Sequence, residues 1–426
     1  MTAIGLRRSR RPRLRLVPAA AGTLRSRATD PTAVTGATPS QRLGLSLVVV
    51  VALLSLLGSV MILSASSVWA VAEAGSAFAV FIKQCMWLLI SSAALFVGAK
   101  LDYHRWAQWV PLLVLGALGL LFAVLIPGVG MNVNGAQRWI GFGFVQLQPA
   151  EPAKFALIVF CAALVARNVH RVHELAVVLR PALVVLGMFA VLLMKQPNLG
   201  TTMILCAIVG GMLLWAGIPM RILGVLGGAA VVLGTTFALS ADYRRARVTG
   251  FLDPWENAGD AGYQTIQSLI GVASGGVSGT GLGASRAKWG FLPEAHTDFV
   301  FAIIGEELGL IGCLFVVALF AGLIGLGLRI AQRASDPFGA MLAVGVTTWF
   351  AVQGFVNVGA VLSLLPITGV PLPFVSFGGS SLVATMLAAG VLVNVAFQGE
   401  EPDNPVRARI AARRARNATR PTHPLG

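Results

Sequence analysis

Ten mostly apolar segments, each close to the length of a membrane-crossing helix, limit what this sequence can fold into. An α-helix needs about 20 apolar residues to cross the hydrocarbon core of a bilayer. Of the 426 residues, 56% are hydrophobic and only 12% are charged, which is more apolar surface than a soluble core can hide. The sequence therefore predicts an all-α integral membrane protein with about ten transmembrane helices, at residues 44–64, 78–99, 107–126, 151–167, 181–194, 200–217, 222–240, 299–327, 338–360 and 379–397.

Two basic segments flank these helices. Residues 1–43 and 399–426 are rich in Arg, Pro and Ala, and we predict that both are disordered cytoplasmic tails attracted to anionic headgroups. The first segment is too long for the short n-region of a cleavable signal peptide. The chain is thus predicted to consist of two tails and one transmembrane domain over residues 44–398, with a long loop at 241–298 between the seventh and eighth helices.

The positions of Lys and Arg predict the orientation of the helices. The tails and loops on the side of the N-terminus hold 23 of the 32 Lys and Arg residues, and the loops on the opposite side hold seven. Cytoplasmic loops are enriched in Lys and Arg, so both termini are predicted to be cytoplasmic. Because the Lys and Arg residues follow the membrane topology, the net charge of +15 does not indicate a nucleic-acid-binding protein. The loops at 134–154, 195–202, 243–299 and 364–381, which carry most of the polar motifs, are then extracytoplasmic.

The sequence lacks the motifs that mark metal, nucleotide and dinucleotide sites. The four cysteines lie in apolar runs without metal-ligand spacing, so we interpret them as small apolar side chains: Cys85, Cys161, Cys206 and Cys313. There is no Walker A lysine motif, and the Gly-rich run at 279–283 lacks the strand and helix context of a dinucleotide fingerprint. We therefore predict no nucleotide cofactor.

The acidic segment Glu294-Ala-His296-Thr297-Asp298 directly precedes the predicted eighth helix. One interpretation is structural, because an acidic or hydroxyl side chain there satisfies free N–H groups and suits the helix dipole. The functional interpretation is a carboxylate at the membrane boundary that takes a proton or binds a cation. Asp298 fits this role, with Glu294 and His296 as nearby alternatives, and the two interpretations are compatible.

Five basic residues in the long loop form the next candidate group: Arg244, Arg245, Arg247, Arg286 and Lys288. They either anchor the loop to lipid headgroups or bind an anion. Outer loops generally avoid such clusters, which favours a bound anion with the chemistry of a phosphate. Arg244, Arg247 and Lys288 are the residues that we expect to contact it, and Arg138 in the outer loop before the fourth helix is a further candidate.

A Gly- and Ser-rich segment precedes the predicted tenth helix. Backbone N–H groups at Ser376, Gly378, Gly379 and Ser380 would point at an anion, assisted by the helix dipole. The alternative is that these small residues allow close helix packing. Three prolines before the segment predict a broken, re-entrant loop that is buried in protein or lines a cavity.

Charged side chains inside predicted helices are costly in lipid and raise a functional hypothesis. Lys83, Glu306 and Glu307 are of this kind, and the polar residues Gln353 and Asn357 also lie within predicted helices. Glu151 and Lys154 are three residues apart on one predicted helix, so a structural ion pair is the leading interpretation for them. Pairs that stabilise the helix bundle remain the alternative for the whole group.

These motifs together resemble those of the SEDS family, the polytopic shape, elongation, division and sporulation proteins. The resemblance covers roughly residues 42–398 and rests on GAQRWI, QPAEPAK, QPNLGTT, YRRARVTGFLDPW, LPEAHTDFVFAIIGEELGLIG and NVGAVLSLLPITGVPLPFVSFGGSSL in order. Within the family, GLGASRAKWGFLPEAHTDF resembles the cell-division branch more than the elongation branch. The chain departs from the usual family pattern in one place, where Asn198 stands at a position that usually holds Asp, so this position cannot act as a base here.

The resemblance implies a peptidoglycan glycosyltransferase in the cytoplasmic membrane that polymerises lipid II at its outer face, with inversion at the anomeric carbon. It also implies partnership with a class B penicillin-binding protein, an FtsI-like transpeptidase, and with other divisome proteins at the septum. The essential acidic residue of the family matches Asp298, to which we assign the role of general base. A second role for Asp298, holding a divalent cation such as Mg²⁺ or Mn²⁺, follows from the pyrophosphate of the substrate.

Two other classes of function stay open at the level of sequence. A transporter that flips lipid II would use the charged residues within the helices, such as Lys83 and Glu307. A divisome scaffold would use the tails to recruit partners and leave catalysis to another protein.

Overall fold

A computed structural model describes residues 38–133, 136–142, 145–172, 174–239, 242–259 and 262–399. Most of the two predicted tails, residues 1–37 and 400–426, falls outside the described residues. The helices, 3-10 helices and strands, in chain order, are α1 (Pro39–Ala74), α2 (Ala79–Lys100), α3 (His104–Gln108), α4 (Val110–Ala123), β1 (Gly130–Val133), β2 (Ala136–Phe142), β3 (Val145–Leu147), α5 (Ala150–Arg167), η1 (Val169–Arg171), α6 (Leu179–Lys195), α7 (Leu199–Ala216), α8 (Met220–Leu239), α9 (Asp242–Leu252), α10 (Tyr263–Ser274), η2 (Ala287–Trp289), α11 (Val300–Arg333), α12 (Pro337–Val361) and α13 (Gly379–Gln398).

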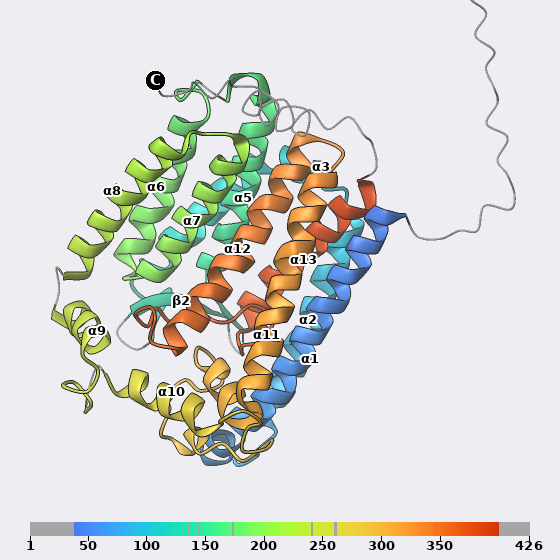
Figure 1. Cartoon of the computed structure of the whole chain (residues 1–426). Helices are drawn as coiled ribbons and strands as arrows, with labels where there is room; N and C mark the ends of the chain where they lie inside the picture. The colour runs from blue at the N-terminus through green and yellow to red at the C-terminus, as the bar shows by residue number, and fades with distance from the viewer. Residues whose placement is uncertain are drawn as a thin grey trace, which may run out of the picture. The chain divides into compact units, whose positions relative to one another are not determined.

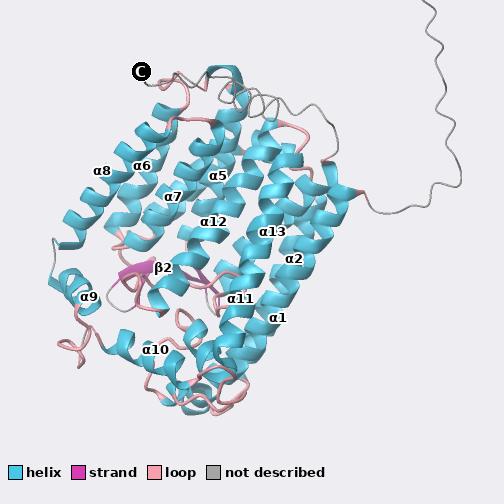
Figure 2. Cartoon of the chain, in the orientation of Figure 1, coloured by secondary structure: helices cyan, strands magenta, loops and turns pink. Residues whose placement is uncertain are grey.

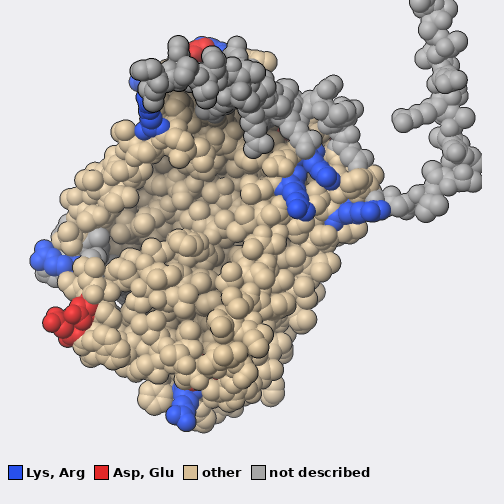
Figure 3. Space-filling model, in the orientation of Figure 1, with Lys and Arg blue, Asp and Glu red and all other residues tan. Residues whose placement is uncertain are grey.

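The structure confirms a mostly helical membrane protein. Each of the ten apolar segments overlaps one of the long helices, and among the described residues seven helices are long and apolar enough to cross a membrane. Large apolar side chains point away from the bundle, with Leu89, Leu112 and Val225 exposed by 75%, 72% and 73%. Figure 3 shows one face of the molecule, on which the described Lys, Arg, Asp and Glu residues lie toward its margins and leave a broad uncharged band between them. A surface of this kind suits lipid rather than water.

Local sequence explains where two of the long helices begin. Thr38 caps α1 through its hydroxyl oxygen, which accepts a hydrogen bond from the Gln41 amide (3.2 Å), while Gln41 Oε1 accepts one from the Thr38 amide (3.0 Å). The helix thus starts at Pro39, five residues before the predicted span. Asp336 caps α12 in a similar way, accepting from the amides of Phe338 and Gly339 at 3.3 and 3.1 Å.

Glycines allow two parallel helices, α2 and α13, to touch along their backbones. A Cβ on Gly98 would lie 2.6 Å from the Leu387 carbonyl oxygen, and one on Gly390 would lie 2.1 Å from that of Leu95. Such close approach is how membrane helices associate without a hydrophobic driving force between them. Both helices run toward the end of the bundle at which α1 begins. There Gly399 follows α13 and lies beside α1, since a Cβ on Gly399 would be 3.0 Å from Ser40 Oγ.

One feature corrects the all-α prediction, and a second adds detail to the long loop. The segment between α4 and α5 forms a three-stranded antiparallel sheet in the order β1-β2-β3, drawn in magenta below α6 and α7 in Figure 2. The long loop predicted at 241–298 contains α9, α10 and η2 rather than irregular chain alone. Figure 1 shows β2, α9 and α10 at the end of the bundle opposite the start of α1. We call this end, with the sheet, α9, α10 and the α12–α13 connection, the loop end.

Candidate active site

Asp298 lies at the loop end, directly before α11, and its side chain is half-buried. The Asn357 amide on α12 fixes its backbone, because Asn357 Nδ2 donates a hydrogen bond to the Asp298 carbonyl oxygen at 2.8 Å. The same nitrogen donates to the Val370 carbonyl oxygen at 2.9 Å. One buried amide thereby connects the start of α11, the C-terminal part of α12 and the loop that follows α12.

Arg138 reaches the same region from the sheet. It is the extra residue of a bulge in β2, because Trp139 pairs with Met131 and Gln137 pairs with Asn132. Its guanidinium donates to two carbonyl oxygens at the end of α6, through Nε to Gln196 (3.2 Å) and through Nη2 to Pro197. The Gln196 side chain is itself held, since its Nε2 donates to the Leu121 carbonyl oxygen at 2.8 Å. A cation held by two carbonyl groups is well placed to face an anion.

Gly369 brings these two groups to one point. It has a φ of +70° in the loop after α12 and is exposed. A Cβ added there would lie 3.5 Å from Asp298 Oδ2 and 4.0 Å from Arg138 Nη1. The fold therefore brings a carboxylate and a guanidinium from distant parts of the sequence close to the same exposed glycine. Sequence reasoning missed Gly369, because only tertiary structure reveals what faces it.

The other two residues of the acidic segment have local partners. Glu294 is exposed, has a φ of +57°, and accepts a hydrogen bond from Thr297 Oγ1 at 2.9 Å. His296 packs against Phe377, with ring centroids 5.7 Å apart, and its carbonyl oxygen accepts from the Phe377 amide. Burial lowers the pKa of His296, opposed by the nearby Glu294 carboxylate, so the imidazole is neutral at pH 7. A neutral imidazole adds no positive charge to a substrate-binding surface.

The predicted basic group is divided in the structure. The side chains of Arg244 and Arg247 lie outside what is described, although their backbone belongs to α9. Lys288 is buried, with its ammonium nitrogen 3.8 Å from Glu307 Oε1 and 3.5 Å from Ser64 Oγ on α1. It also donates to the Gly283 carbonyl oxygen. This environment gives Lys288 a structural role in joining the long loop to α1 and α11.

Glu306 and Glu307 hold the long loop against a break in α11. Glu306 accepts from Ser285 Oγ and from the amides of Arg286 and Ala287, and Glu307 accepts from Ser64 Oγ at 2.5 Å. Gly309 has non-helical angles (φ 66°, ψ −161°), and the chain at 276–281 pairs with the helix at this break. The sequence left open whether these two carboxylates serve function or packing. In the structure they bind the loop to the helix that follows Asp298.

The pairing at the break explains the Gly-rich segment that begins at Gly275. The amides of Thr280 and Gly281 donate to the carbonyl oxygens of Glu306 and Glu307 at 2.9 and 3.1 Å. A Cβ on Gly279 would lie 2.1 Å from the Glu307 carbonyl oxygen, and one on Gly275 would lie 1.9 Å from that of Gly305. These glycines permit backbone contact with α11.

The Gly- and Ser-rich segment before α13 is also packed. Ser376 Oγ accepts from the Leu372 amide at 2.8 Å, and Ser380 Oγ accepts from the Gln148 amide at 3.2 Å. Gly379 lies against the Trp87 ring, whose nearest atom would be 2.2 Å from an added Cβ. Gly378 precedes the helix with an extended φ of 174°. These contacts match the close-packing alternative for the segment.

Glu151 and Lys154 form a buried ion pair at 2.8 Å in the interior of the bundle. Lys154 also donates to Gln353 Oε1 at 2.7 Å, and its nitrogen lies 4.8 Å from the centre of the Trp349 ring. Gln353 Nε2 in turn donates to the Pro371 carbonyl oxygen at 2.9 Å. This network connects α5, α12 and the α12–α13 connection below the candidate site. Lys83, in contrast, is exposed on α2.

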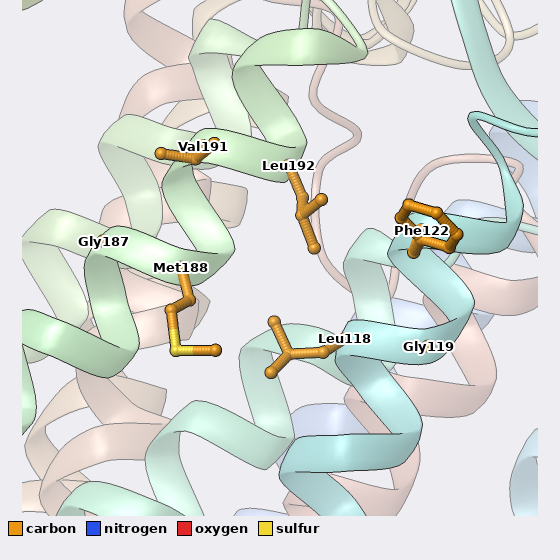
Figure 4. Close-up of a pocket in the computed structure, with 7 residues that line it drawn as sticks. All are labelled: Leu118, Gly119, Phe122, Gly187, Met188, Val191 and Leu192. Carbon is orange, nitrogen blue, oxygen red and sulfur yellow. The ribbon is translucent and has the colours of Figure 1, made fainter.

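Two apolar hollows lie on the flanks of the bundle. The first, of about 460 Å³, is lined by α2, α4, α5 and α13 and includes Trp87, Phe155 and Ser380. The second, of about 670 Å³, separates α4 from α6 and is lined by apolar side chains and glycines; Figure 4 shows Leu118 and Phe122 facing Met188 and Leu192 across it. The first hollow reaches the loop end at Ser380, whose hydroxyl oxygen binds the Gln148 amide of the β3–α5 connection. The second hollow offers apolar contacts alone.

Comparison with known proteins identifies the family. The profile of the family described as "Cell cycle protein" (FtsW, RodA and SpoVE) matches residues 45–401. A probable peptidoglycan glycosyltransferase FtsW of Geobacter metallireducens is 40% identical over 83% of this chain and 95% of the relative, and stage V sporulation protein E of Bacillus subtilis is 40% identical over 82% and 96%. The crystal structure of Thermus thermophilus RodA is 28% identical, with a TM-score of 0.62 over 83% of this chain and 97% of that one. A chain of a peptidoglycan synthase complex is 30% identical, with a TM-score of 0.67 over the same shares. The chain therefore belongs to the FtsW/RodA/SpoVE family, the SEDS proteins that its motifs resemble.

Proposed function

We propose that this protein is a peptidoglycan glycosyltransferase that polymerises lipid II into glycan strands at the outer face of the cytoplasmic membrane during cell division. Family membership and the likeness to a probable peptidoglycan glycosyltransferase FtsW support the reaction class. The observation that carries the proposal for this chain is the meeting of Asp298 and Arg138 over Gly369 at the loop end. A carboxylate beside a fixed cation suits a reaction that removes a proton and releases a pyrophosphate.

The topology that we propose has ten membrane-crossing helices, with both termini cytoplasmic. The two described ends of the chain lie side by side at Ser40 and Gly399, which fits an even number of crossings. The excess of Lys and Arg in the tails and in the loops on that side fits a cytoplasmic location for this end. The loop end then faces outward, where the sugars and pyrophosphate of lipid II lie.

The mechanism that we propose is one inverting displacement. Asp298 takes the proton from a sugar hydroxyl of the acceptor while that oxygen forms a bond to the anomeric carbon of the donor. The bond from this carbon to the pyrophosphate oxygen breaks, and its electron pair leaves with undecaprenyl pyrophosphate. Arg138 compensates the negative charge near Asp298, and we propose that Arg244 and Arg247 of α9 meet the pyrophosphate from the long loop. No covalent enzyme intermediate is needed.

A divalent cation is a further component of this proposal. Among the described residues, no group of three or more His, Cys, Asp and Glu side chains is arranged to hold a metal ion. Magnesium is often held by one or two carboxylates together with substrate phosphates. Asp298 would then be the one protein ligand to a Mg²⁺ or Mn²⁺ ion, which would offset the charge of the pyrophosphate. Titration of polymerisation with EDTA and then with Mg²⁺ tests this role.

The first apolar hollow, lined by α2, α4, α5 and α13, suits the polyprenyl chain of the substrate. Its described lining is almost wholly apolar, and its Ser380 end lies at the loop end, whereas Leu113 and Leu387 lie deeper in the bundle. A class B penicillin-binding protein is the proposed partner, since one structural neighbour comes from a complex that coordinates polymerization and crosslinking.

The direct test uses purified full-length protein with lipid II in detergent. Asp298→Ala should abolish glycan polymer, whereas Glu256→Gln, which removes an exposed carboxylate of the same loop, should leave polymer formation unchanged. Both variants should keep the melting temperature of the parent protein. Near-normal polymer from Asp298→Ala would remove Asp298 from the reaction. A protein that moves lipid II across vesicles but yields no polymer, with or without its partner, would instead be a flippase, and one that does neither would be a scaffold.

A further inference from the structure

The second apolar hollow, between α4 and α6, stays open because side chains are lacking on both of its walls. Gly119 on α4 and Gly187 on α6 line it, and no atom of the described residues lies within 4 Å of the Cβ position of either. Figure 4 shows these two glycines on the bordering ribbons, with Leu118 and Leu192 extending into the space between the helices. The hollow of about 670 Å³ is thus apolar along its described lining.

A lysine stands at the outer end of this hollow. Lys195 is exposed and ends α6, three residues after Leu192 and four after Val191, which both line the hollow. It therefore lies on the same face of the helix, one turn nearer the loop end. Gly187 lies about 12 Å deeper along α6, at 1.5 Å per residue. This depth is within the ~15 Å of one half of the hydrocarbon core, so with the loop end outside the hollow opens to lipids of the outer leaflet.

The first hollow has the same arrangement. Lys83 on α2 is exposed and lies four residues before Trp87 and seven before Ile90, which both line that hollow. Trp87 packs on Gly379 at the start of α13, so Lys83 is also one turn nearer the loop end. Each hollow combines an apolar wall at membrane depth with an ammonium group at its outer end. Such a site fits a lipid that carries an anionic headgroup.

The outer end of the second hollow leads to the candidate active site. Gln196 follows Lys195, and its carbonyl oxygen accepts a hydrogen bond from Arg138 Nε at 3.2 Å. Arg138 and Asp298 both lie close to Gly369. A headgroup beside Lys195 is therefore brought toward the segment that carries the proposed base.

The first hollow reaches the same segment from a different helix. Its lining residue Ser380 lies three residues after Phe377. The Phe377 amide donates to the carbonyl oxygen of His296, two residues before Asp298, at 3.0 Å. The two hollows, which share α4 as a wall, thus lead to the acidic segment from α6 and from α13.

We propose that the second hollow binds the polyprenyl chain of a second lipid-linked substrate, with Lys195 beside its pyrophosphate. This inference rests on the proposed function. The first addition joins two molecules of lipid II, and each carries its own polyprenyl pyrophosphate. One chain occupies the first hollow and the other occupies the second, so that both headgroups lie near Asp298. The acceptor hydroxyl and the anomeric carbon of the donor are thereby held together before the bond forms.

Undecaprenyl pyrophosphate with a diazirine in its chain tests the site, because it lacks the sugar and cannot be polymerised. With purified full-length protein in detergent, photolabelling should mark residues of α4 and α6 in the second hollow as well as residues of the first. An excess of phosphatidylglycerol should leave both labels in place. The inference is overturned if the α4–α6 label is absent, or if phosphatidylglycerol removes it.

Gly187→Phe fills the second hollow. We expect the α4–α6 label and the initial rate of lipid II polymerisation to fall by about 10-fold, the effect of losing apolar contact equal to about two buried CH2 groups. The label in the first hollow should be unchanged. Gly322→Phe on α11 is the matched control, because Gly322 is exposed and no atom of the described residues lies within 4 Å of its Cβ position. It should keep the parental labels and rate.

Lys195→Gln tests the cation at the outer end. The α4–α6 label should weaken by about 10-fold, the effect of losing one hydrogen bond to a charged group, and Lys195→Arg should restore it. Arg180→Gln removes an exposed cation from the other end of α6 and should change neither label nor rate. Equal effects of Lys195→Gln and Arg180→Gln would contradict a headgroup site at Lys195.

If Gly187→Phe does not fold, Gly119→Leu replaces it and fills the same hollow from α4. Equal rates of the filled variant and Gly322→Phe overturn the inference. The parent protein separates the two levels of the argument. Polymer without label between α4 and α6 overturns the second lipid site alone, whereas label in both hollows without polymer, with or without the partner, overturns the proposed polymerase.

Discussion

Asn357 shows how a single amide positions a reactive carboxylate from a neighbouring helix. Its side chain is buried in α12, and its Nδ2 binds the carbonyl oxygens of Asp298 and Val370. These two residues belong to the start of α11 and to the loop after α12. A buried carbonyl group that loses its donor costs about 1–3 kcal/mol. Loss of this amide should therefore release both segments at once.

Asn357→Leu keeps similar volume and removes the donor. We expect kcat for polymerisation to fall by about 10- to 100-fold, because small displacements of positioned groups have effects of this size. The KM for lipid II should change little, since Asn357 does not reach the substrate. Initial rates at a series of lipid II concentrations measure both quantities.

Asn394→Leu provides the control at the other end of the bundle. Asn394 is also buried and also joins two segments, through the Ala99 carbonyl oxygen and the Tyr103 amide. It should lower the melting temperature as Asn357→Leu does, yet leave the rate per folded molecule unchanged. An equal loss of rate in the two variants would mean that Asn357 acts through general stability.

Sequence analysis identified Asp298 because acidic residues before an apolar helix are a local pattern. It did not bring Asp298 and Arg138 together, since they are 160 positions apart and meet through tertiary packing. Lys288 was expected to face an anion, but the structure encloses it against Glu307. The sequence shows that a charge is present and does not show which partner the fold supplies.

At the scale of elements, the break in α11 couples the long loop to the helix that follows Asp298. The chain at 276–281 forms hydrogen bonds to residues 306–311, on both sides of Gly309. Non-helical backbone at membrane depth is tolerated where its polar groups are satisfied by protein. Glu306 adds three hydrogen bonds to the loop at 285–287, so this part of the loop is an integral wall of the bundle.

Gly279→Ala should disrupt this pairing. The new Cβ would lie 2.1 Å from the Glu307 carbonyl oxygen, at a residue with a φ of +81°. Gly281→Ala is the control, with a φ of +102° and no atom of the described residues within 4 Å. We expect Gly279→Ala to be less stable than Gly281→Ala by about 1–3 kcal/mol, the usual cost of overpacking. Thermal unfolding in detergent measures the difference, and equal melting temperatures would show that the pairing contributes nothing.

Hydrophobic segments predicted the long helices because each needs a continuous apolar stretch. The sheet at 130–147 was missed, because its strands are short and its alternation of side chains is interrupted by glycines such as Gly141. The helices α9 and α10 were missed for a related reason. They lie between two hydrophobic runs, in a segment that the hydropathy pattern identifies only as a loop.

At the scale of the whole molecule, the proposed function depends on which way the loop end faces. Cysteine substitutions report this directly, in a background without the four native cysteines. Glu294→Cys should react with a membrane-impermeant maleimide in intact cells, because Glu294 is exposed at the loop end. Glu174→Cys, also exposed but in the loop between α5 and α6, should react only after the cells are opened. The reverse pattern would leave the candidate site without access to lipid II.

The proximity of Ser40 and Gly399 has a practical consequence for engineering the protein. Because the first and last described helices meet there, a short peptide linker could join residues 38 and 399, in place of the two terminal segments, without stretching the bundle. A circularly permuted chain could then begin and end in the loop around Glu174. In such a chain the helices would be synthesised and inserted into the membrane in a new order. Its folding would therefore separate the role of chain order in membrane insertion from the role of helix packing.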